Sequence, residues 1–168
     1  MQLPNNKKIY FTSDQHFGAP TPELSFPREQ KFVAWLDEVK GDAEAIFLLG
    51  DLFDFWFEYK TVVPKGFIRV LGKLAEIRDS GIPIYFFVGN HDLWMADYFQ
   101  KELNIPVFHD NQEYTFGDKT FLIGHGDGKG PGDLGYKRMK KVFTNPFSKW
   151  LFRWLHPDIG VRLGHYLS

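Results

Sequence analysis

The 168-residue sequence contains no cysteine. This absence excludes disulfide bonds and thiolate metal sites, and it fits a protein of a reducing compartment. The sequence also lacks any run of about 18 apolar residues, the length that a transmembrane helix needs. Its first residues contain no apolar segment of the kind found in signal peptides. We therefore expect neither a membrane-spanning helix nor secretion through a signal peptide.

The amino acids that are present are typical of one folded domain. Hydrophobic residues make up 43% of the chain and charged residues 24%, a composition that excludes a disordered chain. A chain of this length can bury one hydrophobic core but is too short for two domains that each bury a core of their own.

Charge is distributed unevenly along the chain. Residues 1–128 contain 12 Lys and Arg against 19 Asp and Glu, whereas residues 129–168 contain 8 against 2. The basic end is also rich in aromatic residues, namely Tyr136, Phe143, Phe147, Trp150, Phe152, Trp154 and Tyr166. A basic and aromatic segment beside an acidic body indicates contact with an anionic amphiphile or a membrane surface, and nucleic acid binds by the same chemistry. The alternative is an ordinary helical subdomain whose aromatic residues form a core and whose lysines face water.

The hydrophobic pattern predicts strands that alternate with helices. Continuous apolar runs indicate buried strands, and apolar residues at three- and four-residue spacings indicate helices. The expected elements are strand 8–12, loop 19–27, helix 28–40, strand 45–49, helix 65–80, strand 84–88, short helix 93–103, and hairpin strands 114–116 and 120–123. This order predicts an α/β fold with a largely parallel sheet, helices on both of its faces, and active-site residues beyond the carboxyl ends of the strands. From Tyr136 onward, helix-like segments follow, punctuated by Pro146, Pro157 and Gly160.

Four short polar motifs directly follow the expected strands. They are Asp14-Gln15-His16, Gly50-Asp51, Gly89-Asn90-His91-Asp92 and Gly124-His125-Gly126-Asp127. Because the strand ends meet at one edge of a sheet, we expect these polar side chains to converge. Carboxylate, imidazole and carboxamide groups are ligands suited to two divalent metal ions. The motifs therefore predict a metal-dependent phosphoester hydrolase.

Each motif taken alone has a simpler explanation. An Asp-x-His sequence is often a turn aspartate beside a surface histidine, and Asp51 alone has the position of a turn or helix N-cap residue. Asn90 and His125, taken singly, are more often structural. Metal-capable residues after every successive strand favour one shared site over four separate structural roles.

The ordered motifs resemble those of the calcineurin-like metallophosphoesterases, over about Ile9 to Asp127. The resemblance implies that Asp14, His16 and Asp51 hold a first metal ion. It implies that Asp51, Asn90 and His125 hold a second, with Asp51 bridging the two. Such a pair of ions activates water for in-line attack on phosphorus.

The resemblance also assigns a role to His91. In the family the matching histidine lies near the leaving-group oxygen and pairs with an acidic residue that matches Asp54. That pairing would orient the imidazole as a proton donor. The alternative is that His91 caps the following helix. We expect Asp92 and Asp127 to be N-cap or loop-pinning residues rather than ligands.

The stretch from Gly50 to Trp56, the Gly124-His125-Gly126-Asp127 motif and the later Gly135-Tyr136 resemble the UDP-2,3-diacylglucosamine pyrophosphatases of lipid A synthesis. This narrower resemblance implies hydrolysis of UDP-2,3-diacylglucosamine to UMP and 2,3-diacylglucosamine 1-phosphate, usually with manganese, and no nucleic-acid partner. It implies a core in residues 1–128 and a helical lid in residues 129–168, peripheral on the cytoplasmic face of the bacterial inner membrane. The expected substrate-binding residues are Lys137, Arg138, Lys141 and Trp150.

Two features depart from this narrower pattern. The best-studied members have Arg at the position of His91, and the family closes its site with a Gly-His-x-His motif that is absent here. We therefore expect a core that lacks its final strands, with partial metal occupancy and little activity. Two alternatives stay open: a calcineurin-like phosphodiesterase or phosphatase with another substrate, and a non-enzymatic binding module.

Overall fold

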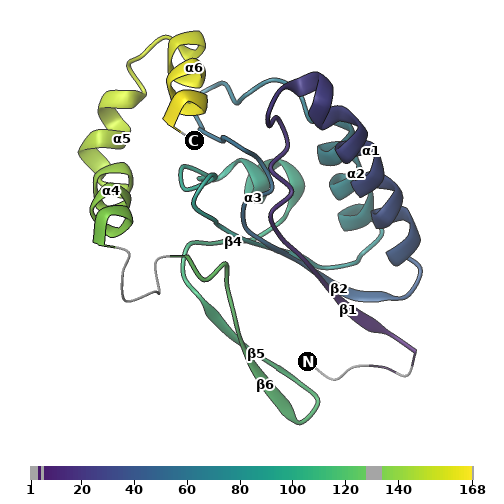
Figure 1. Cartoon of the computed structure of the whole chain (residues 1–168). Helices are drawn as coiled ribbons and strands as arrows, with labels where there is room; N and C mark the ends of the chain where they lie inside the picture. Colours follow the sequence, from purple (N-terminus) through teal and green to yellow (C-terminus); the bar gives the residue numbers. More distant parts are fainter. Residues whose placement is uncertain (1–3, 5, 128–133, 168) are drawn as a thin grey trace.

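The computed structural model describes residue 4, residues 6–127 and residues 134–167. Figure 1 shows the elements in chain order: β1 (Lys8–Thr12), α1 (Pro22–Val39), β2 (Ala43–Leu49), α2 (Ile68–Asp79), β3 (Ile84–Phe87), α3 (Tyr98–Leu103), β4 (Val107–Phe108), β5 (Gln112–Phe116), β6 (Lys119–Ile123), α4 (Leu134–Thr144), α5 (Pro146–Phe152) and α6 (Pro157–Leu167). The predicted α/β class is confirmed.

A parallel sheet in the order β1-β2-β3-β4 forms the centre of the fold. Ile9 pairs with Ala45, Ile46 with Ile84, and Phe86 with Val107. Parallel strands need long crossover connections, which α1, α2 and α3 supply. The carboxyl ends of all four strands consequently lie at the same edge of the sheet.

The two faces of this sheet are covered differently. Phe32 and Leu36 of α1 and Leu74 of α2 pack with Leu48 on one face, and α3 joins the same cluster. On the other face, the hairpin β5–β6 covers the sheet, with Tyr114 packed edge-on against Phe47 at 5.0 Å between ring centroids. The prediction of helices on both faces is therefore wrong for the described part of the chain. A continuous apolar strand requires cover on both sides, but it does not specify whether a helix or a hairpin provides it.

Three local expectations also need correction. Helix α1 begins at Pro22 instead of residue 28, because the Thr21 side chain caps it. A proline at the first helical position loses no helical hydrogen bond, so Pro22 is compatible with this start. Pro27 lies inside the helix. Helix α3 begins at Tyr98 instead of residue 93, because Trp94 forms a β-bridge with Phe57. The two-residue strand β4 was not predicted, since it is too short to show a hydrophobic period.

The helices α4, α5 and α6 pack against the segments that follow β2 and β3. The ring of Phe152 lies 4.6 Å from those of both Phe57 and Trp94, and the Trp94 indole donates to the Phe143 carbonyl oxygen at 2.6 Å. Pro157 begins α6 as its position suggests, but Gly160 lies inside that helix instead of interrupting it. Along the described helices, none combines the length and apolar character that crossing a bilayer requires. The division at residues 128 and 129 stays a prediction.

Candidate metal centre

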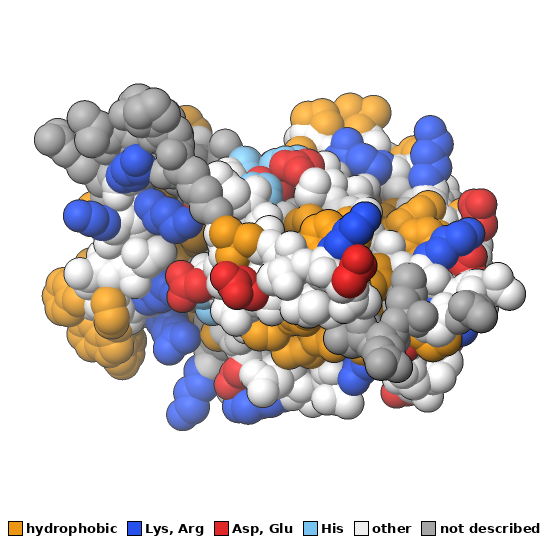
Figure 2. Space-filling model, turned by 90° about the horizontal axis from the view of Figure 1, so that it is seen from below, with side chains coloured by type: hydrophobic (Ala, Val, Ile, Leu, Met, Phe, Trp, Pro, Cys, Tyr) orange, Lys and Arg blue, Asp and Glu red, His pale blue; other side chains and the backbone are white. Residues whose placement is uncertain are grey.

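The first two polar motifs meet at the carboxyl edge of the sheet because their backbones extend the pairing of β1 with β2. The Asp14 amide donates to the Gly50 carbonyl oxygen at 3.1 Å, and the His16 amide donates to the Asp51 carbonyl oxygen at 2.9 Å. The loop after β1 therefore runs beside the loop after β2. Figure 2 shows histidine and acidic side chains gathered near the upper edge of the face that it draws.

Three of the converging residues have unusual backbones. Asp14, His16 and Asp51 all adopt left-handed conformations, with φ of 57°, 45° and 53°. L-residues seldom occupy this region, and such strained positions cluster at functional sites. The surrounding structure must therefore hold these residues in place.

Two glycines let the loops after β2 and β3 approach each other behind Asp51. A Cβ atom on Gly50 would lie 2.7 Å from the Gly89 Cα, and one on Gly89 would lie 2.1 Å from Asp51 Oδ1. Any side chain at Gly89 would consequently displace the carboxylate.

Asp14, His16 and Asp51 form the first group of candidate ligands. His16 Nε2 lies 3.9 Å from Asp14 Oδ1 and 3.8 Å from Asp51 Oδ2, and one ligand atom from each residue lies within 4.8 Å of the other two. Two carboxylates and an imidazole at these separations are a donor set that a divalent cation can bind. The structure brings these predicted residues together.

Asn90 and His125 form the second group of candidate ligands beside the Asp51 carboxylate. His125 Nε2 is 3.3 Å from Asp51 Oδ2 and 3.2 Å from Asn90 Oδ1. The same oxygen, Asp51 Oδ2, therefore lies within 3.8 Å of the imidazoles of both His16 and His125. This central place is the one that a bridging ligand requires.

The electrostatics of this pair follow from its contacts. The hydrogen bond to Asp51 raises the pKa of His125 to about 9, against the effect of burial. Burial acts to raise the pKa of Asp51, but hydrogen bonds from His125 and from the His91 amide leave it below its usual range. A cation bound here would replace the proton of His125 in stabilising the Asp51 charge.

His91 and Asp54 also lie together. His91 Nδ1 is 3.0 Å from the Asp54 carbonyl oxygen and 3.7 Å from its Oδ1, and His16 Nδ1 is 3.8 Å from the same Oδ1. A carbonyl oxygen can only accept, so Nδ1 of His91 carries the hydrogen and the ring is oriented by Asp54. The alternative role of His91 as a helix cap is wrong, because Asp97 holds the N-cap position of α3.

Asp92 and Asp127 act as loop-pinning residues, as predicted. The buried Asp92 accepts hydrogen bonds from the amides of Gly89 at 2.6 Å and Leu52 at 3.1 Å, so it ties the loop after β3 to the loop after β2. Burial and the nearby Asp51 charge raise its pKa to about 7. Asp127 pairs with Lys140 of α4 at 2.6 Å.

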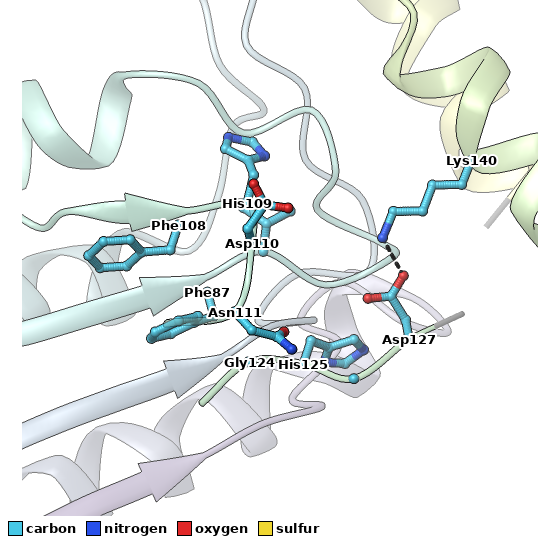
Figure 3. A pocket seen from close by; sticks show the side chains of 11 residues that line it. Phe87, Phe108, His109, Asp110, Asn111, Gly124, His125, Asp127 and Lys140 are labelled. Atoms are coloured by element: carbon cyan, nitrogen blue, oxygen red, sulfur yellow. Dashed lines mark hydrogen bonds and ion pairs between the residues drawn. The ribbon is translucent and has the colours of Figure 1, made fainter. Parts of the chain in front are cut away.

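A cavity of about 260 Å³ opens beside His125. Figure 3 shows its wall formed by His109, Asp110 and Asn111, which follow β4, with Lys140 reaching from α4 to Asp127. Burial, helped by the charge of Lys149, lowers the pKa of His109. No sequence motif pointed to His109, because this residue follows β4, the strand that was not predicted.

The predicted substrate residues lie on the helices that follow. Lys137 is half-buried, Lys141 is exposed, and the side chain of Arg138 lies outside the described residues. Trp150 is 52% exposed and belongs to a row of aromatic rings, with Phe147 at 5.8 Å and Trp154 at 5.9 Å. In Figure 2, hydrophobic and basic side chains gather on the left, where these helices lie. Because only Phe152 of this aromatic segment is buried among the described side chains, core packing does not explain the exposed row.

Comparison with known proteins connects this geometry to a family. Residues 7–167 match the sequence profile of the family described as calcineurin-like phosphoesterase. The chain is 41% identical over 162 residues to a UDP-2,3-diacylglucosamine hydrolase of Porphyromonas gingivalis, covering 96% of this chain and 62% of the relative. It is 32% identical over 143 residues to a UDP-2,3-diacylglucosamine hydrolase of Edwardsiella ictaluri, covering 85% of this chain and 53% of that protein. The chain thus spans between about half and two thirds of the length of these relatives.

A solved structure supports the fold alone. The protein of unknown function AQ665 from Aquifex aeolicus superposes with a TM-score of 0.52 at 19% identity, over 82% of this chain and 73% of that one. The sequence profile extends over nearly the whole chain and includes all four polar motifs. The chain belongs to the calcineurin-like phosphoesterase family.

Proposed function

We propose that this chain carries the catalytic centre of a divalent-metal-dependent hydrolase that cleaves the pyrophosphate bond of UDP-2,3-diacylglucosamine. The products would be UMP and 2,3-diacylglucosamine 1-phosphate. The proposal rests on the position of one carboxylate oxygen. Asp51 Oδ2 lies 3.8 Å from His16 Nε2 and 3.3 Å from His125 Nε2. The substrate is taken from the relatives, which are named UDP-2,3-diacylglucosamine hydrolases.

The donor set fits two divalent cations. In this proposal Asp14, His16 and Asp51 hold one ion, and Asp51, Asn90 and His125 hold the other. The ligand atoms are carboxylate oxygens, imidazole nitrogens and a carboxamide oxygen, which suit manganese and similar metals. When bound, such ions activate water and neutralise charge on the phosphate oxygens.

The protein's own groups would orient these ligands and move the proton. His125 donates through Nδ1 to the Leu49 carbonyl oxygen at 2.7 Å, which leaves Nε2 directed at Asp51 and Asn90. His91 donates through Nδ1 to the Asp54 carbonyl oxygen, so its other ring nitrogen would serve the departing phosphate oxygen. In this proposal that nitrogen of His91 would donate a proton to the leaving oxygen as the phosphorus–oxygen bond breaks.

The helices α4 and α5 would bind the two ends of the substrate. Lys137, Arg138 and Lys141 would contact phosphate groups, and Trp150 would contact acyl chains or the bilayer edge. The exposed row of Phe147, Trp150 and Trp154 supports this part of the proposal. A lipid substrate of this type implies a peripheral position on the cytoplasmic face of the inner membrane.

The test compares two substrates in the presence of Mn²⁺. UMP release from UDP-2,3-diacylglucosamine and nitrophenol release from bis-p-nitrophenyl phosphate are measured with this chain and, where its gene encodes further residues, with the full-length form. We expect UMP release that Asp51→Asn abolishes. Cleavage of the simple ester alone would overturn the lipid assignment. It would favour a phosphodiesterase with another substrate, the reading that His91 in place of Arg also favours.

A further inference from the structure

The loop between β1 and α1 carries two of the candidate ligands in an unfavourable conformation. Asp14 and His16 both have positive φ angles, 57° and 45°. Each such residue is strained and keeps its conformation only where its surroundings over-determine it. Some part of the fold must therefore hold this loop.

One side of the loop is held by the loop after β2. The amides of His16 and Phe17 donate to the carbonyl oxygens of Asp51 and Leu52, both at 2.9 Å, and the Asp54 amide donates back to the Phe17 carbonyl oxygen at 3.0 Å. These bonds fix the amide side of His16. They leave its carbonyl side to other contacts.

Arg28 of α1 holds that carbonyl side together with the Ala19 amide, which donates to the His16 carbonyl oxygen at 3.2 Å. Arg28 Nη2 donates to the His16 carbonyl oxygen at 2.8 Å and to the Ala19 carbonyl oxygen at 2.6 Å. Hydrogen bonds from a charged donor are short and strong. The Nε of Arg28 is buried without a hydrogen bond among the described residues, so the guanidinium occupies this place through its bonds to the two carbonyls.

A second contact from the same face of α1 supports the loop. The Gly18 amide donates to Ser25 Oγ at 2.8 Å, and the Ser25 hydroxyl donates to Glu29 Oε1 at 3.3 Å. Ser25, Arg28 and Glu29 are spaced by three and four residues and therefore share one side of the helix. Ser25 is fully buried and Glu29 nearly so.

We propose that Arg28 is a positioning residue of the metal centre, which fixes the His16 carbonyl and through it the imidazole beside Asp14 and Asp51. This inference rests on the proposed function, because it assigns Asp14 and His16 to a metal ion. Without Arg28 the backbone of His16 relaxes from its left-handed conformation, and the ring leaves the Asp51 carboxylate. Residues that orient a metal ligand typically change metal affinity by about 10- to 100-fold when removed.

The test uses Arg28→Ala with Arg78→Ala as its matched control. Arg78 also binds two backbone carbonyl oxygens, those of Asn104 and Ile82, at 2.9 and 3.0 Å, but between α2 and α3 and away from the site. Mn²⁺ binding is measured by calorimetry. We expect about 10- to 100-fold weaker binding of one ion in Arg28→Ala and an unchanged value in Arg78→Ala. Millimolar guanidinium should restore part of the loss in Arg28→Ala.

A metal-free measurement separates this inference from the proposed function. The ring resonance of His16 is assigned by its loss in His16→Gln and followed by NMR in protein without metal. We expect this resonance to shift or broaden in Arg28→Ala and to match the wild type in Arg78→Ala. If the wild type binds no cation, the proposed function fails while the NMR comparison still decides whether Arg28 positions His16.

Two outcomes would overturn the inference. An Arg28→Ala variant with wild-type His16 resonance and wild-type Mn²⁺ affinity would show that the loop holds itself. Equal losses in Arg28→Ala and Arg78→Ala would reduce the effect to general destabilisation. Should Arg28→Ala not fold, Arg28→Lys takes its place, since a lysine keeps the charge but has one donor nitrogen. It should show a smaller shift in the same direction.

Discussion

The His125 imidazole is fixed by the backbone of Leu49, whose carbonyl oxygen accepts a hydrogen bond from Nδ1 at 2.7 Å. The ring therefore presents Nε2 to Asp51, and this contact raises the pKa of His125 to about 9. One atom thus has two competing uses: it binds a proton in the metal-free protein, and it would bind a cation in the loaded one. The competition makes the site sensitive to pH.

We expect the affinity for Mn²⁺ to rise with pH up to about 9. Below that value His125 is protonated, so each cation that binds at Nε2 must displace a proton, and the affinity should rise by about tenfold per pH unit. Calorimetry in buffers of different ionisation enthalpy measures the released proton. A pH-independent affinity between 7 and 9 would show that His125 is not a ligand.

The stability of the metal-free protein should change in the opposite direction. The folded pKa of His125 lies above its ordinary value of 6.5, so the pairing with Asp51 stabilises the fold fully below pH 6.5 and is lost as the pH rises through about 9. At low pH this contribution disappears once Asp51 is protonated. That happens at a pH below the usual pKa of an aspartate, because the pKa of Asp51 is lowered. Thermal melts across this range should show the decline, and His125→Gln should remove it.

A methyl group at Gly89 should disable the centre. The new Cβ would lie 2.1 Å from Asp51 Oδ1, so the carboxylate that faces both His16 and His125 must move. We expect Gly89→Ala to weaken the binding of both ions and to destabilise the fold. Gly72→Ala is the control: nothing lies within 4 Å of its Cβ, and alanine in an exposed helix adds up to about 1 kcal/mol of stability. Wild-type metal binding in Gly89→Ala would contradict the central role of Asp51.

The sequence predicted the strands and the converging motifs because both are local patterns. Strand β1 has the predicted bounds, Lys8–Thr12, because polar residues directly follow its apolar run. Asp14 and Asp51 could be placed at one edge because the parallel strands β1 and β2 align their ends, whereas His125 reaches the site from β6 of the antiparallel hairpin. What failed left no periodic pattern in the sequence. The start of α1 at Pro22 depends on a single local cap, Thr21. The hairpin on the second sheet face depends on contacts between distant residues, and it replaces a helix that the apolar run of β2 would equally have accepted.

Two supporting contacts, one at the site and one outside it, were not predictable because they join distant residues. Arg28 and Glu58 have no motif around them, and their roles appear only when their partners are located. Arg28 meets the carbonyl oxygen of His16 twelve residues earlier, and Glu58 meets an amide 39 residues later. No periodicity in the chain marks such pairs.

Glu58 should be a major stabilising residue although it lies outside the metal centre. Its carboxylate is buried and accepts from the Trp56 indole at 3.0 Å and from the amides of Asp97 and Tyr98 at 2.8 and 3.0 Å, so it caps α3 from a distance. Removing it leaves buried donors without partners, and we expect Glu58→Ala to lose about 2–4 kcal/mol of unfolding free energy. Asp97→Ala is the comparison, because the Asp97 side chain makes no capping bond, and its loss should stay below about 0.5 kcal/mol. Similar losses in both variants would assign the cap to Asp97.

The exposed aromatic row should act in binding rather than in folding. Trp150 and Trp154 are 52% and 74% exposed. The free energy of unfolding of the double variant Trp150→Ala, Trp154→Ala should therefore differ from that of the wild type by less than about 0.5 kcal/mol. If the row contacts lipid, the variant should bind vesicles of phosphatidylethanolamine and phosphatidylglycerol at least about tenfold more weakly in sedimentation assays. Leu24→Ala controls for loss of any exposed apolar side chain, since Leu24 is 66% exposed on α1, away from these helices. If the double variant binds vesicles like the wild type but melts at a lower temperature, the inference of lipid contact is wrong. The aromatic row would then stabilise the fold by packing between the helices.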